Sequence, residues 1–105
     1  MNRSLAKLSF QDRNHLPSRV KQGFKWCTNT NGCSPNDWSI FLYFTEDVQS
    51  DNTAKVEISF LMPTAEYLLQ VGAKFKIFSG SINQDLTVEV IETLEPLAQD
   101  RFGSP

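Results

Sequence analysis

The sequence predicts an all-β fold, a small six-stranded antiparallel β-barrel with little or no helix. Six short segments alternate apolar and polar side chains with the period of two that is typical of strands, and no segment shows a helical period over several turns. A chain of 105 residues forms one domain with one core. Closure is expected because open sheet edges promote aggregation. The barrel is expected to span residues 1–94, followed by a loose C-terminal tail over residues 95–105.

The N-terminal half supplies three strands and one long loop. The first strand is expected over residues 4–10. Residues 11–23 have no steady period and contain a proline and a glycine, so they are expected to form a basic loop. Further strands are expected at residues 24–28 and 37–46, joined by a turn in which Asn31-Gly32 can adopt the positive φ of a tight hairpin. The side chains expected to share the inward faces are Ala6, Leu8, Phe10, Phe24, Trp26, Trp38, Ile40, Leu42 and Phe44.

The C-terminal half supplies the other three strands. One is expected within residues 53–63 and ends before the proline there. Residues 64–72 are expected to form a turn of helix or an irregular crossing, and residues 72–92 a hairpin. The side chains that the crossing is expected to bring to the core are Leu68, Leu69 and Val71. The inward side chains of the strands are Val56, Ile58, Phe60, Phe75, Ile77, Leu86, Val88 and Val90.

The charge is unevenly distributed along the chain. Residues 1–36 carry six basic residues and one acidic residue, and residues 37–105 carry four basic and eleven acidic residues. The net charge of −2 excludes a generally basic nucleic-acid binder. The asymmetry can mark an interaction surface, although strands from both halves interleave in a barrel and can mix the two signs.

No apolar stretch is long enough for a signal peptide or for a membrane-spanning helix, so a cytoplasmic protein is expected. A reducing compartment keeps Cys27 and Cys33 as thiols. Whether these two cysteines pair is left open by the sequence.

The chain shows no pattern that points to a catalytic mechanism. His15 is its only histidine, which excludes a two-histidine metal site, and Cys27 and Cys33 have no further ligands at zinc-site spacing. A nucleophilic pair of His15 with either cysteine has no supporting motif. The segment SGSINQ, residues 79–84, is interpreted as a hairpin turn, because no helix follows it to hold a phosphate. We therefore expect no enzyme activity, no cofactor and no metal site.

Two surfaces are candidates for binding another macromolecule. The cations of the basic loop stand beside an aromatic residue and could contact an RNA backbone and a base, unless the loop is simply solvated. The second apolar face of strand 37–46 could anchor a protein partner, unless the tail or the basic loop covers it. The candidate partner-binding residues are Arg13, Arg19, Lys21, Lys25, Trp26, Phe41 and Tyr43.

Three segments resemble the C-terminal β-barrel domain of elongation factor Tu and small stand-alone bacterial proteins built on that barrel. AKVEISFLMP, followed by LLQVGAKFKIFSG, is similar to a strand with an L-x-P ending and then an L-x-P-G-x-x-F-x-I/L-x-E-G segment. LAKLSF occupies the place of the first strand, and GFKW is similar to a G-Y-R-P-x-F stretch. The residues that match are Gly23, Phe24, Lys25, Gly72, Phe75, Ile77, Gly80, Val88 and Val90. Val71 and Ser79 depart from the pattern, and either Arg13 or Arg19 could stand for the arginine of its E-G-G-R loop.

The resemblance implies a non-enzymatic binding module. In the elongation factor this barrel contacts tRNA and partner proteins, and small bacterial barrels of this type resemble immunity proteins that neutralise a toxin. We expect a protein partner, and specifically a basic toxin domain that would meet the acidic surface of residues 37–105. The alternative is RNA binding, with a tRNA-like ligand, through the basic loop at residues 13–26.

Overall fold

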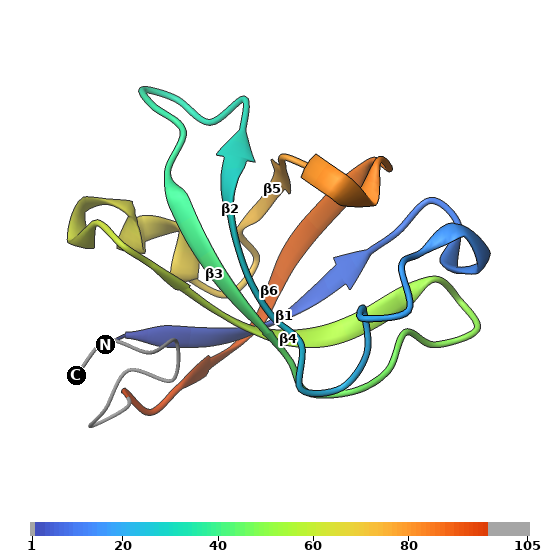
Figure 1. The fold of residues 1–105 in the computed structure, drawn as a ribbon. Coiled ribbons are helices and arrows are strands. Elements are labelled where there is room, and N and C mark those ends of the chain that lie inside the picture. Colours follow the sequence, from blue (N-terminus) through green and yellow to red (C-terminus); the bar gives the residue numbers. More distant parts are fainter. Residues whose placement is uncertain (1, 97–105) are drawn as a thin grey trace.

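The computed structural model describes residues 2–96 and shows a closed antiparallel barrel of six strands (Figure 1). This result confirms the predicted fold class. The strands are β1 (Arg3–Ser9), β2 (Lys25–Asn31), β3 (Ser39–Phe44), β4 (Thr53–Phe60), β5 (Lys74–Ile77) and β6 (Leu86–Leu94). Three short 3-10 helices, η1 (Arg13–His15), η2 (Pro63–Leu69) and η3 (Gly80–Ile82), lie in the connections.

The order of strands around the barrel is β1-β4-β3-β2-β5-β6, and β6 pairs with β1 to close it. Neighbouring strands are antiparallel, so β1, β3 and β5 finish at one end of the barrel and β2, β4 and β6 at the other. The connections from β1 to β2 and from β4 to β5 each pass two strands, and they lie on opposite sides of the view in Figure 1. We call the end crossed by residues 10–24 the basic-loop end, and the end crossed by residues 61–73 the crossover end.

The core lies inside the barrel, and both long connections contribute to it. All the predicted inward side chains of β1, β4, β5 and β6 are buried. Val20 of the basic loop, Ala65 and Leu69 of the crossover and Ile82 of η3 are also buried, and they close the ends. Burial of such aliphatic side chains stabilises the fold by about 1.5–3 kcal/mol each for valine, leucine and isoleucine.

Two sequence predictions about the connections were wrong. Val71 is 64% exposed rather than buried, because η2 ends at Leu69 and Val71 lies in the turn before Gly72, which has a φ of +92°. The strand expected at residues 24–28 continues to Asn31, so its predicted end at Thr28 was three residues too early. The reason is that the end of β2 pairs with β5, which the local turn signal does not reveal.

Two buried serines differ in how their hydroxyl groups are satisfied. The Ser4 side chain is fully buried, and its Oγ donates a hydrogen bond to the Leu69 carbonyl, which ties η2 to the start of β1. Ser59 lies on β4 directly opposite Phe41 of β3, and it is 2% exposed. Its Oγ has no hydrogen-bond partner among residues 2–96. An unpaired buried hydroxyl costs free energy.

The same substitution at these two serines should have different effects on the free energy of unfolding. Ser4→Ala is expected to lower it by about 1–3 kcal/mol, because the Leu69 carbonyl loses its donor. Ser59→Ala is expected to leave it unchanged or to raise it by up to about 1 kcal/mol, because an unpaired hydroxyl is removed. Urea unfolding measures both values. Equal losses in the two variants would contradict this assignment.

Candidate partner-binding surfaces

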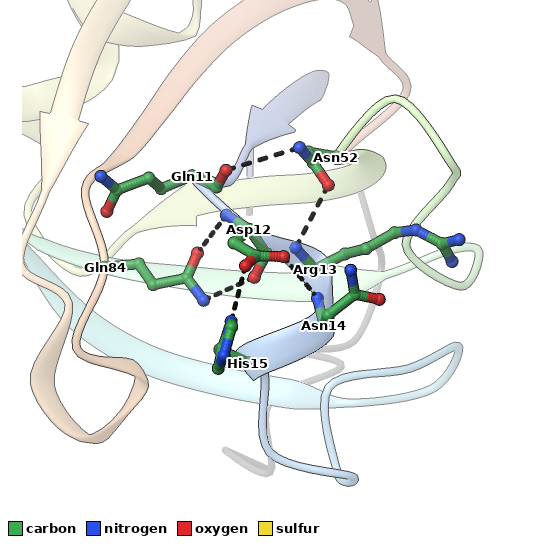
Figure 2. Close-up of polar contacts among 7 residues, drawn as sticks. All are labelled: Gln11, Asp12, Arg13, Asn14, His15, Asn52 and Gln84. Atoms are coloured by element: carbon green, nitrogen blue, oxygen red, sulfur yellow. Dashed lines mark hydrogen bonds and ion pairs between the residues drawn. The ribbon is translucent and has the colours of Figure 1, made fainter.

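Side-chain amides hold the start of the basic loop against two other connections (Figure 2). Gln84, which precedes β6, accepts a hydrogen bond from the Asp12 backbone N–H at 2.8 Å and donates one to the Asp12 carbonyl at 2.6 Å. Asn52, in the β3–β4 connection, accepts from the Arg13 N–H at 3.1 Å and donates to the Gln11 carbonyl at 3.4 Å. The loop therefore starts from a fixed position.

Asp12 caps the short helix η1. One carboxylate oxygen accepts from the Asn14 N–H at 2.9 Å, and the other lies 2.6 Å from His15 Nδ1. The pKa of Asp12 is held below its ordinary value, mainly by the hydrogen bond from the Asn14 N–H and next by the one with His15. The described residues that line the hollow beside this pair carry no hydroxyl or thiol group that could act as a nucleophile. The Asp12–His15 pair thus orders the loop. Cys33, one of the two thiols considered as a nucleophile beside His15, lies at the other end of the barrel.

Three of the predicted cations lie on the basic loop. Arg13 belongs to η1, and Arg19 and Lys21 flank Val20, which is buried and whose N–H bonds to the Pro17 carbonyl at 3.0 Å. Anchoring of Val20 leaves the residues on either side of it at the surface, and all three cations are exposed. The basic-loop end therefore presents these three side chains to solvent.

The other four predicted residues lie together on β2 and β3. Lys25 is directly opposite Tyr43, and Cys27 is directly opposite Phe41. A shallow hollow of about 170 Å³ lies among Lys25, Cys27, Phe41 and Trp26. Phe41 and Tyr43 are half-buried. The seven predicted residues thus form two groups, one on the barrel wall and one across its end.

Trp26 is packed against other aromatic rings. It is half-buried, and its ring stacks on Phe24 with centroids 6.4 Å apart and an interplanar angle of 19°. Phe24 in turn contacts the fully buried Phe44 at 5.6 Å. This arrangement confirms that Phe24 and Trp26 share a face. It also means that much of the Trp26 ring is engaged within the fold rather than presented as a stacking platform.

A third surface, at the crossover end, was missed by the sequence analysis. Six large apolar side chains are exposed in the described part of the chain, and four belong to residues 61–71. They are Leu61, Met62, Tyr67 and Val71, with exposed fractions of 58, 48, 44 and 64%. We call these four side chains the apolar crossover surface. The only signal in the sequence was the density of apolar residues in this segment, and Val71 was the one of the four that we assigned to the core.

A groove of about 480 Å³ lies beside this surface, between the β2–β3 connection, η2 and β5. The Tyr67 hydroxyl closes one side of it, because it donates to the Ser34 carbonyl at 3.2 Å and accepts from Trp38 Nε1 at 3.3 Å. The residues that line the groove are Asn31, Gly32, Cys33, Ser34, Tyr67, Leu68, Lys74, Phe75 and Lys76. None of these described lining residues is acidic, so the groove has a positive lining.

The β2–β3 connection is organised by Asp37. Its carboxylate accepts hydrogen bonds from the Cys33 N–H at 2.8 Å and from Thr30 Oγ1 at 3.1 Å. Thr30 Oγ1 also accepts from the Trp38 N–H at 2.8 Å. Donation from the Cys33 N–H is the main cause that holds the pKa of Asp37 below its ordinary value. The wall of the groove that this connection forms is therefore held in place by its own hydrogen bonds.

Comparison with known proteins adds no relative, since no family model, curated protein or solved structure matches the chain. The six-stranded barrel is shown by the structure, and any closer likeness to the barrel of elongation factor Tu remains a prediction. Residues 2–96 contain no group of three His, Cys, Asp or Glu side chains that could hold a metal ion. Both cysteines are free thiols. No described helix is long and apolar enough to cross a membrane.

Removal of the Gln84 side chain should loosen the basic loop. Gln84→Ala is expected to speed hydrogen exchange of the Asp12 amide and to lower the free energy of unfolding by about 1–2 kcal/mol, because two hydrogen bonds are lost. Gln84→Glu is the second variant, since it keeps an acceptor for that amide but replaces the donor with a carboxylate oxygen that faces the Asp12 carbonyl. It should retain part of the protection. Unchanged exchange in Gln84→Ala would show that other contacts hold the loop.

The contribution of Asp37 to stability should depend on pH. Its folded-state pKa is lowered, so the contribution is complete above its ordinary value of 3.8 and is lost as the pH falls through the lower folded value. Asp37→Asn is therefore expected to lower the urea midpoint at pH 7, and the difference from the unsubstituted protein should shrink in acid. A difference that stays constant on acidification would contradict the role of the carboxylate.

Proposed function

We propose that the protein is a non-enzymatic protein-binding module that docks a partner on its apolar crossover surface. The observation that carries this proposal is the exposure of Leu61, Met62, Tyr67 and Val71 within residues 61–71 of one connection. Water contact with apolar surface costs roughly 25 cal/mol per Å², and a partner that covers these side chains removes that cost. Large apolar side chains exposed near one another in a single connection are a feature that often marks a protein interface.

The rigidity of the crossover supports the proposal. Ala65 and Leu69 of η2 are buried, Ser4 bonds to the Leu69 carbonyl, and the Tyr67 hydroxyl bonds to the β2–β3 connection. A surface that is already ordered loses little conformational entropy on binding. The exposed side chains therefore sit on a preorganised support, which favours docking of a partner without rearrangement.

The specific form that we propose is an immunity protein that neutralises a cognate bacterial toxin. Its support is the resemblance of the sequence to small bacterial barrels and the size of the domain. The carboxylates that were expected to meet a basic toxin lie at both ends of the barrel, for example Glu66 at the crossover end and Asp47 at the basic-loop end. Charge steering would therefore act over the whole molecule, and contact at the crossover would be mainly apolar.

RNA binding through the basic loop is the second candidate. Arg13, Arg19 and Lys21 are exposed at one end of the barrel, which favours contact with phosphates. Against it, Trp26 stacks within the fold on Phe24 instead of offering a free ring face to a base. We therefore prefer the protein partner.

The test compares partner capture by variants from lysate of the source cell. Val71→Asp is expected to weaken a stoichiometric protein partner at least tenfold, which corresponds to about 1.4 kcal/mol, because a charge is placed in the apolar crossover surface. Phe78→Asp is the matched control, since Phe78 is 56% exposed but follows β5 toward the basic-loop end. The Phe78→Asp variant should capture the partner as well as the unsubstituted protein does. Affinity would then be measured by calorimetry with the purified partner.

The same experiment separates the two candidates. Steeply salt-dependent binding of tRNA that is weakened by Arg19→Gln and Lys21→Gln, together with no protein partner sensitive to Val71→Asp, would replace the proposal with RNA binding. Capture of a protein equally by both Asp variants would place its docking site elsewhere and overturn the crossover assignment.

A further inference from the structure

One wall of the groove ends in an unpaired strand edge. The pairing of β2 with β5 consists of Thr30 with Ile77 and Asn31 with Lys76, while β5 itself begins at Lys74. Beyond Asn31 the chain turns away at Gly32, whose φ is +84°. Two residues of β5, Phe75 and Lys74, therefore extend past the last pair with β2, at the place where the groove opens.

The direction of the backbone groups at this edge follows from the antiparallel ladder. The Phe78 N–H bonds to the Asn29 carbonyl on β2, whereas the Ala73 carbonyl accepts from the Val90 N–H on β6. Backbone groups point alternately to the two neighbours of a strand, so those of Lys74 point to the same side as those of Phe78. The N–H and C=O of Lys74 therefore face the β2 side of the strand, beyond the last residue of β2.

The same edge carries two ammonium groups. Lys74 and Lys76 are both exposed, and because they stand two residues apart their side chains leave the strand on one face, roughly 7 Å apart. Glu89 lies opposite Lys74 on β6, but its carboxylate pairs with Lys7 at 3.5 Å. The ion pairs found within residues 2–96 join other residues. An acidic ligand would therefore meet two available cations.

The opposite side of the groove is apolar. Tyr67 and Leu68 of η2 line it together with the ring of Phe75, which points inward from β5 between the two lysines. A segment that continued the path of β2 beside β5 would turn alternate side chains toward the lysines and toward this apolar side. The groove thus matches an extended segment in which acidic and apolar residues alternate.

We propose that the groove binds an extended acidic–apolar–acidic segment of a partner protein by adding it as a short strand beside Lys74. The backbone of the segment would bond to the N–H and C=O of Lys74, its two carboxylates would pair with Lys74 and Lys76, and the residue between them would contact Tyr67 and Leu68. This inference rests on the proposed function, because it describes a second contact with the same kind of partner.

The test uses a fluorescently labelled peptide, acetyl-Glu-Val-Glu-Val-Glu-amide, and the full chain. We expect saturable binding in fluorescence anisotropy and shifts of the Lys74 and Phe75 amide signals in NMR spectra. The double variant Lys74→Gln and Lys76→Gln should lose at least tenfold in affinity. The matched pair of single variants is Lys74→Gln, which should lose affinity, and Lys55→Gln, which removes the same charge from an exposed lysine outside the groove and should bind as the unsubstituted protein does.

A peptide of the same composition, acetyl-Glu-Glu-Glu-Val-Val-amide, tests the alternation. Binding of both peptides with equal affinity would overturn the proposal, because charge alone would then be recognised. Equal losses in Lys74→Gln and Lys55→Gln, or no binding of the alternating peptide, would also overturn it. Val71 does not line the groove, so Val71→Asp should leave peptide affinity unchanged. Tyr67 belongs to both surfaces, but Val71→Asp probes only the apolar crossover surface and Lys74→Gln only the groove, so failure of one proposal can be distinguished from failure of the other.

Discussion

The barrel closes because β1 pairs with both β4 and β6, and this closure limits how every other segment can be connected. With this strand order, the chain can reach β2 from β1, and β5 from β4, only by crossing an open end of the barrel. Each crossing must cover the core, so each contributes buried apolar side chains, Val20 at one end and Ala65 and Leu69 at the other. The two longest connections are therefore structural caps first, and any binding role is placed on their outer faces.

The two caps both cover an end of the core, but they differ in their exposed side chains. At the basic-loop end, Gln84 and Asn52 bond to the loop backbone and the exposed side chains are charged. At the crossover end, Ser4 and Tyr67 hold η2, and large apolar side chains remain in contact with water beside a groove with two lysines. Exposed polar side chains are solvated by water and need no partner, whereas exposed apolar side chains raise the free energy of the unbound protein. This difference is why we assign docking to the crossover end.

The cations of the candidate surfaces can be recognised in the sequence, but the apolar crossover surface that we now favour cannot. Arg13, Arg19 and Lys21 could be recognised because charges in an irregular loop are expected at the surface. Val71 was assigned to the core because apolar residues of a small domain are expected to be buried, and nothing in its neighbourhood shows that η2 ends two residues earlier. The groove could not be predicted at all, since its walls come from three segments that are far apart in the chain.

From the amino-acid sequence alone we could predict a six-stranded barrel and the inward side chains of most strands. Alternation of apolar and polar side chains is a local pattern that burial of one face imposes on a strand, so it can be read without the tertiary structure. Only the tertiary structure decided which strands are neighbours, that β2 stops short of the start of β5, and that residues 61–71 turn apolar side chains to solvent. Those features depend on hydrogen bonds and packing between distant segments, such as Asn31 with Lys76 and Ser4 with Leu69, which no local pattern encodes.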